Sequence, residues 1–264
     1  RVGVNIGRPV GSSFKASVHA HFISNRDNYI NSDVLVSTDT LDNLVLTGGR
    51  YGFKLETNTL NRKQYANAGK AFLVTFDYFD LDEDLVPGTT SVYRNTQIEK
   101  GHRNWIRGSM ILEQYFRSGI YSSGYYLHGS LSNQPLFANF TGTLINAPAF
   151  NPIQDSRTLF LPNFRSFNFV AGGWRNVFNL RKNVDFRLEG YIFKPFQAIR
   201  EGSKQEPILE EELTKIYFAG TAGIVMHSTI GPVSLSLNYY DDKKNQLGVL
   251  LHVGFLLFNK SSLE

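Results

Sequence analysis

Two histidines of this sequence lie close to a serine, and a serine–histidine pair can activate a hydroxyl for nucleophilic attack. His227 and Ser228 are adjacent, and His128 lies two residues before Ser130. Adjacent residues of a strand point to opposite faces, so only the second pair could share a face. Such i,i+2 pairs are common by chance, and no Gly-x-Ser-x-Gly nucleophile elbow occurs in the sequence. We therefore expect no catalytic residues in this chain.

His19 and His21 are the next candidates, because two imidazoles on one face of a strand could bind a metal ion if a carboxylate joined them. The sequence identifies no third ligand for them. We therefore expect two histidines that face an aqueous interior, and we expect neither a metal site nor a cofactor.

The final segment, residues 247–258, shows most clearly which kind of element carries these residues. Every second position is apolar, while the positions between them include Gly248, His252 and Gly254. Twelve residues are close to the ~9–11 that a tilted strand needs to cross a bilayer. We therefore predict a membrane strand that faces lipid with Leu247, Val249, Leu251, Val253, Phe255 and Leu257.

The same alternation recurs along the chain and predicts eleven strands. It is strongest in residues 184–193, where Asp185, Arg187 and Glu189 would face inward and Leu188 outward. Long polar loops are expected at residues 23–43, 81–103, 132–166 and 194–212, and they alternate with shorter turns near residues 8–13, 58–69, 117–119 and 229–232. Alternating short and long connections are typical of outer-membrane barrels, with short periplasmic turns and long extracellular loops.

The composition agrees with a single membrane barrel domain over residues 1–264. No window approaches the ~20 apolar residues of a transmembrane helix, and the 14% of aromatic residues suits interfacial girdles. The chain has no cysteine, and its net charge of +4 comes without a basic run, so we expect no nucleic-acid partner. The fold class is thus all-β: an antiparallel transmembrane β-barrel of the outer-membrane type, with lipid and lipopolysaccharide as its surroundings.

The number of strands indicates that part of the barrel is missing or overlooked. Bacterial single-chain barrels have even strand numbers, so an odd number of strands should be added at the N-terminal side: one would give twelve, and five would give sixteen. The chain also begins at Arg1 without a signal segment. We expect either a removed leader or a longer parent protein.

A family resemblance enters with Phe164, Arg165, Ser166 and Phe167, which lie in the longest loop with five predicted strands after them. This motif resembles the Val-Arg-Gly-Phe motif in the sixth extracellular loop of the BamA-type superfamily, where five strands also follow. The segments NTLNRKQY (58–65) and NAPAF (146–150), and the tail from YYDD (239–242) to LFNK (257–260), resemble the bacterial surface antigen barrel of patatin-like phospholipases. This resemblance implies the C-terminal part of a sixteen-stranded barrel in the outer membrane of a Gram-negative bacterium.

The resemblance also implies a site and a function. Arg165 would fold into the lumen and pair with Glu189 or Asp185, as a guanidinium that fixes a long loop inside a wet pore. Ser166 departs from the usual glycine of the motif, which puts the tight turn there in question. The barrel would anchor, and also export or display, an N-terminal patatin-like lipase domain on the same polypeptide. No soluble catalytic domain is expected within this chain. An assembly or translocation factor for outer-membrane proteins and a passive porin are the alternatives.

Overall fold

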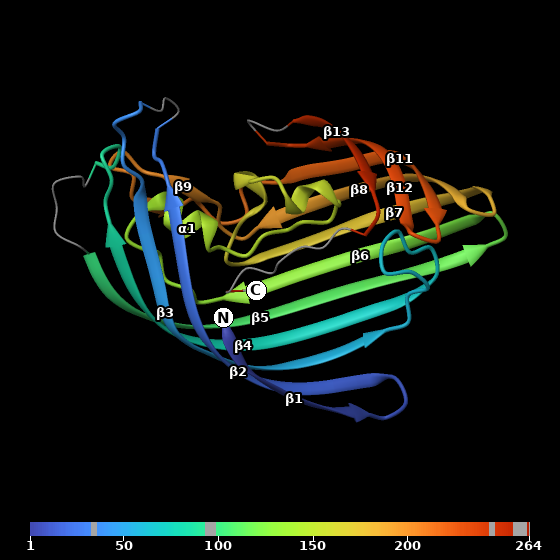
Figure 1. Cartoon of the computed structure of the whole chain (residues 1–264), viewed down its shortest axis with the longest axis horizontal. Helices are drawn as coiled ribbons and strands as arrows, with labels where there is room; N and C mark the ends of the chain where they lie inside the picture. The colour runs from blue at the N-terminus through green and yellow to red at the C-terminus, as the bar shows by residue number, and fades with distance from the viewer. Residues whose placement is uncertain (33–35, 93–98, 243–245, 256–262, 264) are drawn as a thin grey trace.

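The structure, a computed structural model, describes residues 1–32, 36–92, 99–242, 246–255 and 263, and these residues fold around one antiparallel sheet of eleven strands (Figure 1). The spatial order of the strands follows the chain order, so every neighbouring pair is antiparallel. The sheet contains, in order, β1 (Val2–Val10), β2 (Phe14–Tyr29), β3 (Asp42–Asn58), β4 (Gly69–Val86), β5 (Glu99–Ser118), β6 (Tyr121–Ser132), β7 (Phe169–Arg181), β8 (Val184–Pro195), β11 (Tyr217–Ser228), β12 (Gly231–Tyr240) and β13 (Leu247–Val253).

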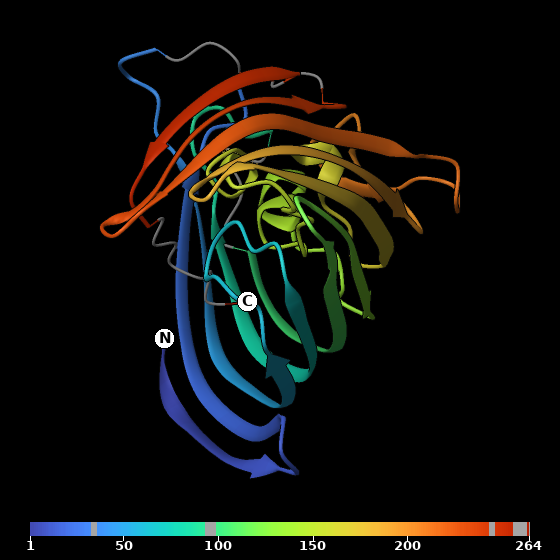
Figure 2. The ribbon, with the colours of Figure 1, turned by 90° about the vertical axis from the view of Figure 1, so that its right-hand side faces the viewer.

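The predicted all-β class and the eleven strands are confirmed. The final strand is shorter than the predicted twelve residues, because β13 ends at Val253 after seven residues. Short turns join the strands at one end of the sheet, and the long connections join them at the other end (Figure 1). The sheet curves strongly around a hollow, yet within the described residues β1 and β13 do not pair, so it remains open between these edges (Figure 2).

Strands β2 to β5 extend further toward the long loops than the polar composition suggested. The strands enter the loops predicted at residues 23–43 and 81–103, because β2 continues to Tyr29, β3 begins at Asp42, β4 continues to Val86 and β5 begins at Glu99. The reason is that alternation continues through the polar stretches. Inward positions such as Ile23 of β2 and Leu81 of β4 are fully buried. The polar residues at the alternate positions of the same strands point outward.

The concave face of the sheet is covered by residues 133–168, the longest connection. This segment contains α1 (Phe140–Ile145) and two short 3-10 turns, η1 (Asp155–Arg157) and η2 (Pro162–Phe164), which lie inside the curve of the sheet (Figure 2). The short strands β9 (Ile199–Glu201) and β10 (Pro207–Leu209) form a separate hairpin in the next long connection. No helix among the described residues is both long and apolar enough to cross a membrane.

Side-chain exposure follows the alternation. On β8, Asp185 and Arg187 are buried at 1% and 5% exposure, whereas Leu188 is 49% exposed on the convex face. The final strand repeats the pattern with the exposed residues Leu247, Val249, Leu251 and Val253, and Phe255 is exposed just beyond it. Leu257 lies outside the described residues.

Candidate functional site

The interior of the sheet is the candidate functional site, because buried ion pairs of the described residues lie there, among them Arg50–Asp77, Arg62–Asp185 and Arg187–Glu189. Residues 133–168 enter the hollow and pack aromatic side chains on β7, β8, β11 and β12. Phe150 is fully buried and stacks on Phe193, with ring centroids 5.7 Å apart, and Phe164 contacts Tyr217 at 6.1 Å. Burying such rings contributes roughly 1.5–3 kcal/mol each, so this segment is an integral part of the inner core.

Asp155 attaches the second half of this segment to β12. Its carboxylate accepts hydrogen bonds from the Tyr240 hydroxyl and from Asn238 Nδ2, the latter at 2.6 Å, and Asp155 is only 8% exposed. Charge-assisted hydrogen bonds of this kind are stronger than neutral ones. Asp155 therefore locks the segment to the strand wall, a role that no motif in the sequence indicated.

The first half of the segment is attached to the opposite part of the wall. Asn139 caps α1 by accepting from the Gly142 N–H at 2.8 Å, and it also accepts the Tyr29 hydroxyl of β2 at 2.7 Å. The N–H of Ala138 donates to Glu83 of β4 at 2.7 Å. Residues 133–168 thus bridge the hollow from β2 and β4 to β12.

Arg165 has a different role from the one the resemblance implied. Its Nη1 donates to the carbonyl oxygens of Leu144, Ile145 and Ala147 at 3.3, 2.7 and 3.2 Å, and its guanidinium lies 5.0 Å from the Phe160 ring centroid. The last carbonyls of a helix have no partner within it, so this arginine caps the C-terminal end of α1. The predicted pairing of Arg165 with Glu189 or Asp185 is therefore wrong, because both carboxylates are bound by other cations.

The other three residues of the motif, Phe164, Ser166 and Phe167, are buried and help to hold residues 133–168 in the interior. Phe164 and Phe167 are 1% and 5% exposed and belong to two inner apolar clusters. The Ser166 hydroxyl donates to the carbonyl of Gln197 at 2.9 Å. The backbone of Ser166 does not enter the left-handed region, so a glycine is not required at this position.

Glu189 belongs to a chain of buried hydrogen bonds on the inner face. It accepts from Arg187 Nε at 2.8 Å and from the Tyr191 hydroxyl at 2.5 Å, and Tyr191 in turn accepts from Arg175 Nε at 2.7 Å. Arg175 Nη1 also donates to Glu113 at 2.5 Å. Two arginines and two glutamates are thereby paired across β5, β7 and β8, which is the condition under which buried charges are tolerated.

Asp185 is bound by a residue that enters the hollow from the end of the sheet with the short turns. The connection of residues 59–68, between β3 and β4, folds into the hollow and places Arg62 Nη1 2.8 Å from Asp185 Oδ2. His227 Nε2 also lies 2.8 Å from this oxygen. In the same connection Tyr65 contacts the Ser234 hydroxyl at 2.8 Å, and burial raises the pKa of Tyr65. The sequence suggested only a compact polar turn here.

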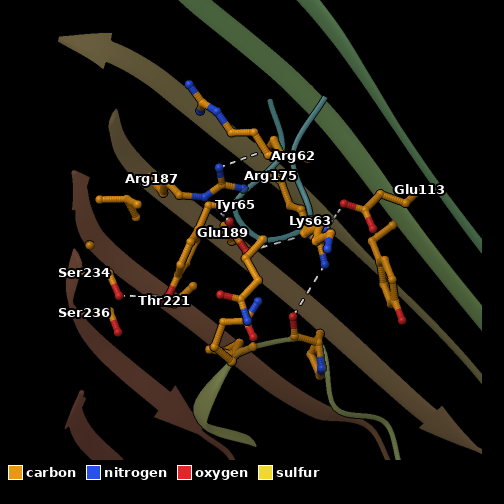
Figure 3. A pocket seen from close by; sticks show the side chains of 18 of the residues that line it. Arg62, Lys63, Tyr65, Glu113, Arg175, Arg187, Glu189, Thr221, Ser234 and Ser236 are labelled. Atoms are coloured by element: carbon orange, nitrogen blue, oxygen red, sulfur yellow. Dashed lines mark hydrogen bonds and ion pairs between the residues drawn. The ribbon is translucent and has the colours of Figure 1, made fainter. Parts of the chain in front are cut away.

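A cavity of about 160 Å³ remains between these two insertions and the strands (Figure 3). Tyr65 and Lys63 enter from the connection of residues 59–68, while Arg175, Arg187 and Glu189 come from β7 and β8. A cavity of this size could hold a few water molecules. It is lined by a network of paired charges, in which Arg175 and Arg187 bind Glu113 and Glu189.

The histidines that the sequence offered for catalysis or metal binding form hydrogen bonds within this interior. His19 Nε2 lies 2.7 Å from Asp77 Oδ1, and Asp77 is also bound by Arg50. Ser130 donates to the carbonyl of Phe167, whereas His128 lies 3.4 Å from Ser109. The described residues include no group of three or more His, Cys, Asp or Glu side chains that could hold a metal ion.

Comparison with known proteins does not identify the chain. No family model matches the sequence, and the search of curated proteins found no similar protein. A functional assignment therefore depends on the geometry of the sheet and its interior.

Proposed function

We propose that this chain forms the wall of an outer-membrane β-barrel that serves as a membrane anchor. The observation that carries the proposal is a band of exposed apolar side chains on the convex face, which is bounded by polar residues. The outward residues of β2 are Phe14, Ala16, Val18, Ala20 and Phe22, followed by Ser24, Arg26 and Asn28, and those of β4 are Phe72, Val74, Phe76 and Tyr78, followed by Asp80, Asp82 and Asp84.

The boundary between apolar and polar residues continues from strand to strand. Tyr51 of β3 pairs with Tyr78 of β4, and Tyr78 pairs with Ile106 of β5. Two residues further along, Asp80 pairs with Asn104, and His102 lies 2.9 Å from both Asp80 and Asp82 on the exposed face. Tyrosines next to a row of charges are typical of the membrane–water interface.

The height of the apolar band agrees with a bilayer. From Phe14 to Phe22 there are eight residue steps, which at ~3.3 Å per residue cover about 26 Å along the strand. From Ile106 to Phe116 there are ten steps, or about 33 Å. With the ~40° tilt of barrel strands, these lengths correspond to a height of roughly 20–25 Å, close to the ~25 Å of outer-membrane barrels.

The filled interior favours an anchor over a passive porin. A porin needs a continuous aqueous lumen, whereas residues 133–168 and 59–68 enter this one from both ends and attach to its wall. As the anchored part we propose an N-terminal patatin-like lipase domain, on the sequence resemblance alone. The intact mass and N-terminal sequence of the protein isolated from outer membranes test this part, because a mass matching this chain would refute it.

Single-cysteine labelling tests the membrane location directly, because this chain contains no cysteine of its own. Phe76 and Asp82 are both exposed on the outer face of β4, with Phe76 in the apolar band and Asp82 beyond its boundary. In intact cells, a membrane-impermeant maleimide should label Asp82→Cys quickly. It should label Phe76→Cys only after the protein has been unfolded in denaturant. Equal labelling of the two variants in intact cells would refute the proposal.

An assembly factor for other barrels is the second candidate, and the open edges of the sheet favour it. Within the part of the chain that the structure describes, β1 pairs with β2 alone and is exposed along its whole length, and β13 forms the other edge. Because β1 and β13 run in the same direction, an odd number of antiparallel strands would be needed to close the barrel between them. Depletion of the protein distinguishes the two roles, since loss of an anchor should leave the other outer-membrane barrels at normal abundance.

A further inference from the structure

The convex face carries an apolar groove over β6, β7 and β8 that the anchor role does not explain. Its volume is about 590 Å³, and apolar side chains form most of its lining. Leu127, Leu131, Val170 and Ile192 form its sides, and they are between 42% and 72% exposed. It is thus an open depression in the surface that would face lipid.

The floor of the groove is low because a glycine, Gly172, takes the place of a side chain. Gly172 pairs with Leu127 on one side and with Ile192 on the other. A Cβ at Gly172 would meet its nearest neighbour, the flexible end of Leu127, at 3.1 Å. Gly172 does not have the positive φ that favours glycine, so the backbone would accept a larger residue there.

The groove is closed toward the long loops by residues of the β8–β11 connection. Phe196 and Leu213 line this end, and the N–H of Leu213 donates to the Phe196 carbonyl at 2.6 Å. Leu213 has φ 57°, a conformation that is uncommon for a residue other than glycine. The groove therefore has one defined end.

A lysine lies at this end. Lys194 occupies an outward position near the end of β8, and its Nζ donates to the Leu213 carbonyl at 3.1 Å. Among the described residues Lys194 forms no ion pair. An outward lysine is unfavourable in the hydrocarbon core, but near a strand end it can reach the headgroup level.

We propose that this groove holds one acyl chain of lipopolysaccharide, the anionic lipid on the extracellular side where the long loops lie, with a lipid A phosphate at Lys194. The inference rests on the proposed membrane location. An unfilled depression in a lipid-facing surface lacks dispersion contacts, and a chain lying in it restores them. The ammonium of Lys194 supplies the complementary charge at the one end where a headgroup would lie.

Native mass spectrometry of the full-length protein with added lipid A, and with lipid A from which the phosphates have been removed for comparison, tests the proposal. Wild-type protein should retain the phosphorylated lipid A preferentially. Lys194→Gln should lower this retention about fivefold, which corresponds to the ~1 kcal/mol contributed by one lysine near an anionic surface. Gly172→Leu should also lower it, because the added side chain would fill the floor of the groove.

Two variants of the same chemistry serve as controls. Gly190→Leu adds a side chain on the outer face of β8 outside the groove, where a Cβ meets nothing within 4 Å. Lys182→Gln removes a lysine at the opposite end of the sheet, in the turn between β7 and β8. Both controls should retain the lipid as the wild type does. Equal retention by all five proteins would overturn the groove proposal.

Flotation with phosphatidylglycerol vesicles separates failure of the groove from failure of the membrane assignment. If all variants float with the vesicles and retain lipid equally, the groove proposal alone is refuted. If the wild-type protein does not associate with vesicles at all, the membrane location is refuted, and the lipid site is refuted with it.

Discussion

Replacing Arg187 by leucine tests whether the buried charges of the interior depend on one another. Arg187 donates to Glu189 at 2.8 Å, to the Ala66 carbonyl at 3.0 Å and to the Tyr115 hydroxyl at 3.3 Å. If residue 187 only faced a water-filled lumen, as the alternation alone suggests, its replacement by leucine would change the free energy of unfolding very little. The geometry predicts a large loss of stability, because Glu189 would keep its charge in a buried site.

The magnitude follows from what remains around Glu189 in Arg187→Leu. Its side chain is 9% exposed, and the nearest remaining cation, Arg175, has its Nε at 3.7 Å. Removing one partner of a buried ion pair costs ~3–5 kcal/mol. Arg175 and the Tyr191 hydroxyl retain part of the stabilisation of Glu189, so we expect a loss near the lower end, about 3 kcal/mol.

Urea unfolding of the reconstituted protein measures this loss, with the fluorescence of Trp105 as a probe because this residue is 1% exposed. The double variant Arg187→Leu/Glu189→Leu removes both charges, and it should be more stable than the sum of the single changes by about 1–3 kcal/mol. If Arg187→Leu unfolds within about 0.5 kcal/mol of the wild type, or if the double variant shows no coupling, the buried network is not what holds this part of the wall.

Three further changes test separate parts of the structure. Leu188→Arg places a charge on the exposed face next to Arg187, and it should cost about 2–4 kcal/mol if that face lies at the bilayer midplane; a cost below 0.5 kcal/mol would indicate that the face meets water. Asp155→Ala should release residues 133–168 from β12, which should increase their protease sensitivity, and unchanged protease sensitivity would contradict the lock. Arg165→Ala should destabilise the C-terminal end of α1 by about 1–2 kcal/mol without coupling to Glu189→Gln in a double-variant cycle, and measurable coupling would restore the pairing implied by the resemblance.

The strands and the orientation of their side chains could be predicted from the sequence, because the alternation within each strand separates inward from outward residues. A period of two residues assigns Asp185 and Arg187 to one face and Leu188 to the other without knowledge of any other strand. The strand ends were less predictable. Outward polar residues such as Arg26 and Asp82 raise the polarity of a segment, although the inward residues between them are still buried.

The interior could not be predicted in the same way, because its contacts join residues that are distant in the chain. Asp155 binds Tyr240, and Arg62 binds Asp185 across 123 positions. Alternation indicated that Asp185 and Glu189 would face inward, but several cations could reach them there. The choice of Arg62 for Asp185 follows from the inward fold of residues 59–68, for which the sequence shows only a polar turn.

The two inward connections also explain how an open sheet can hold a barrel-like curve. Residues 133–168 join β2 and β4 to β12, and residues 59–68 join the β3–β4 hairpin to β8 and β12. Each connection crosses the hollow, so a flatter sheet would break its bonds on one side. The curvature is therefore fixed by side-chain bonds across the interior as well as by the twist of the strands. Because these bonds arise from β12, next to the edge strand β13, they hold this edge of the described wall in place.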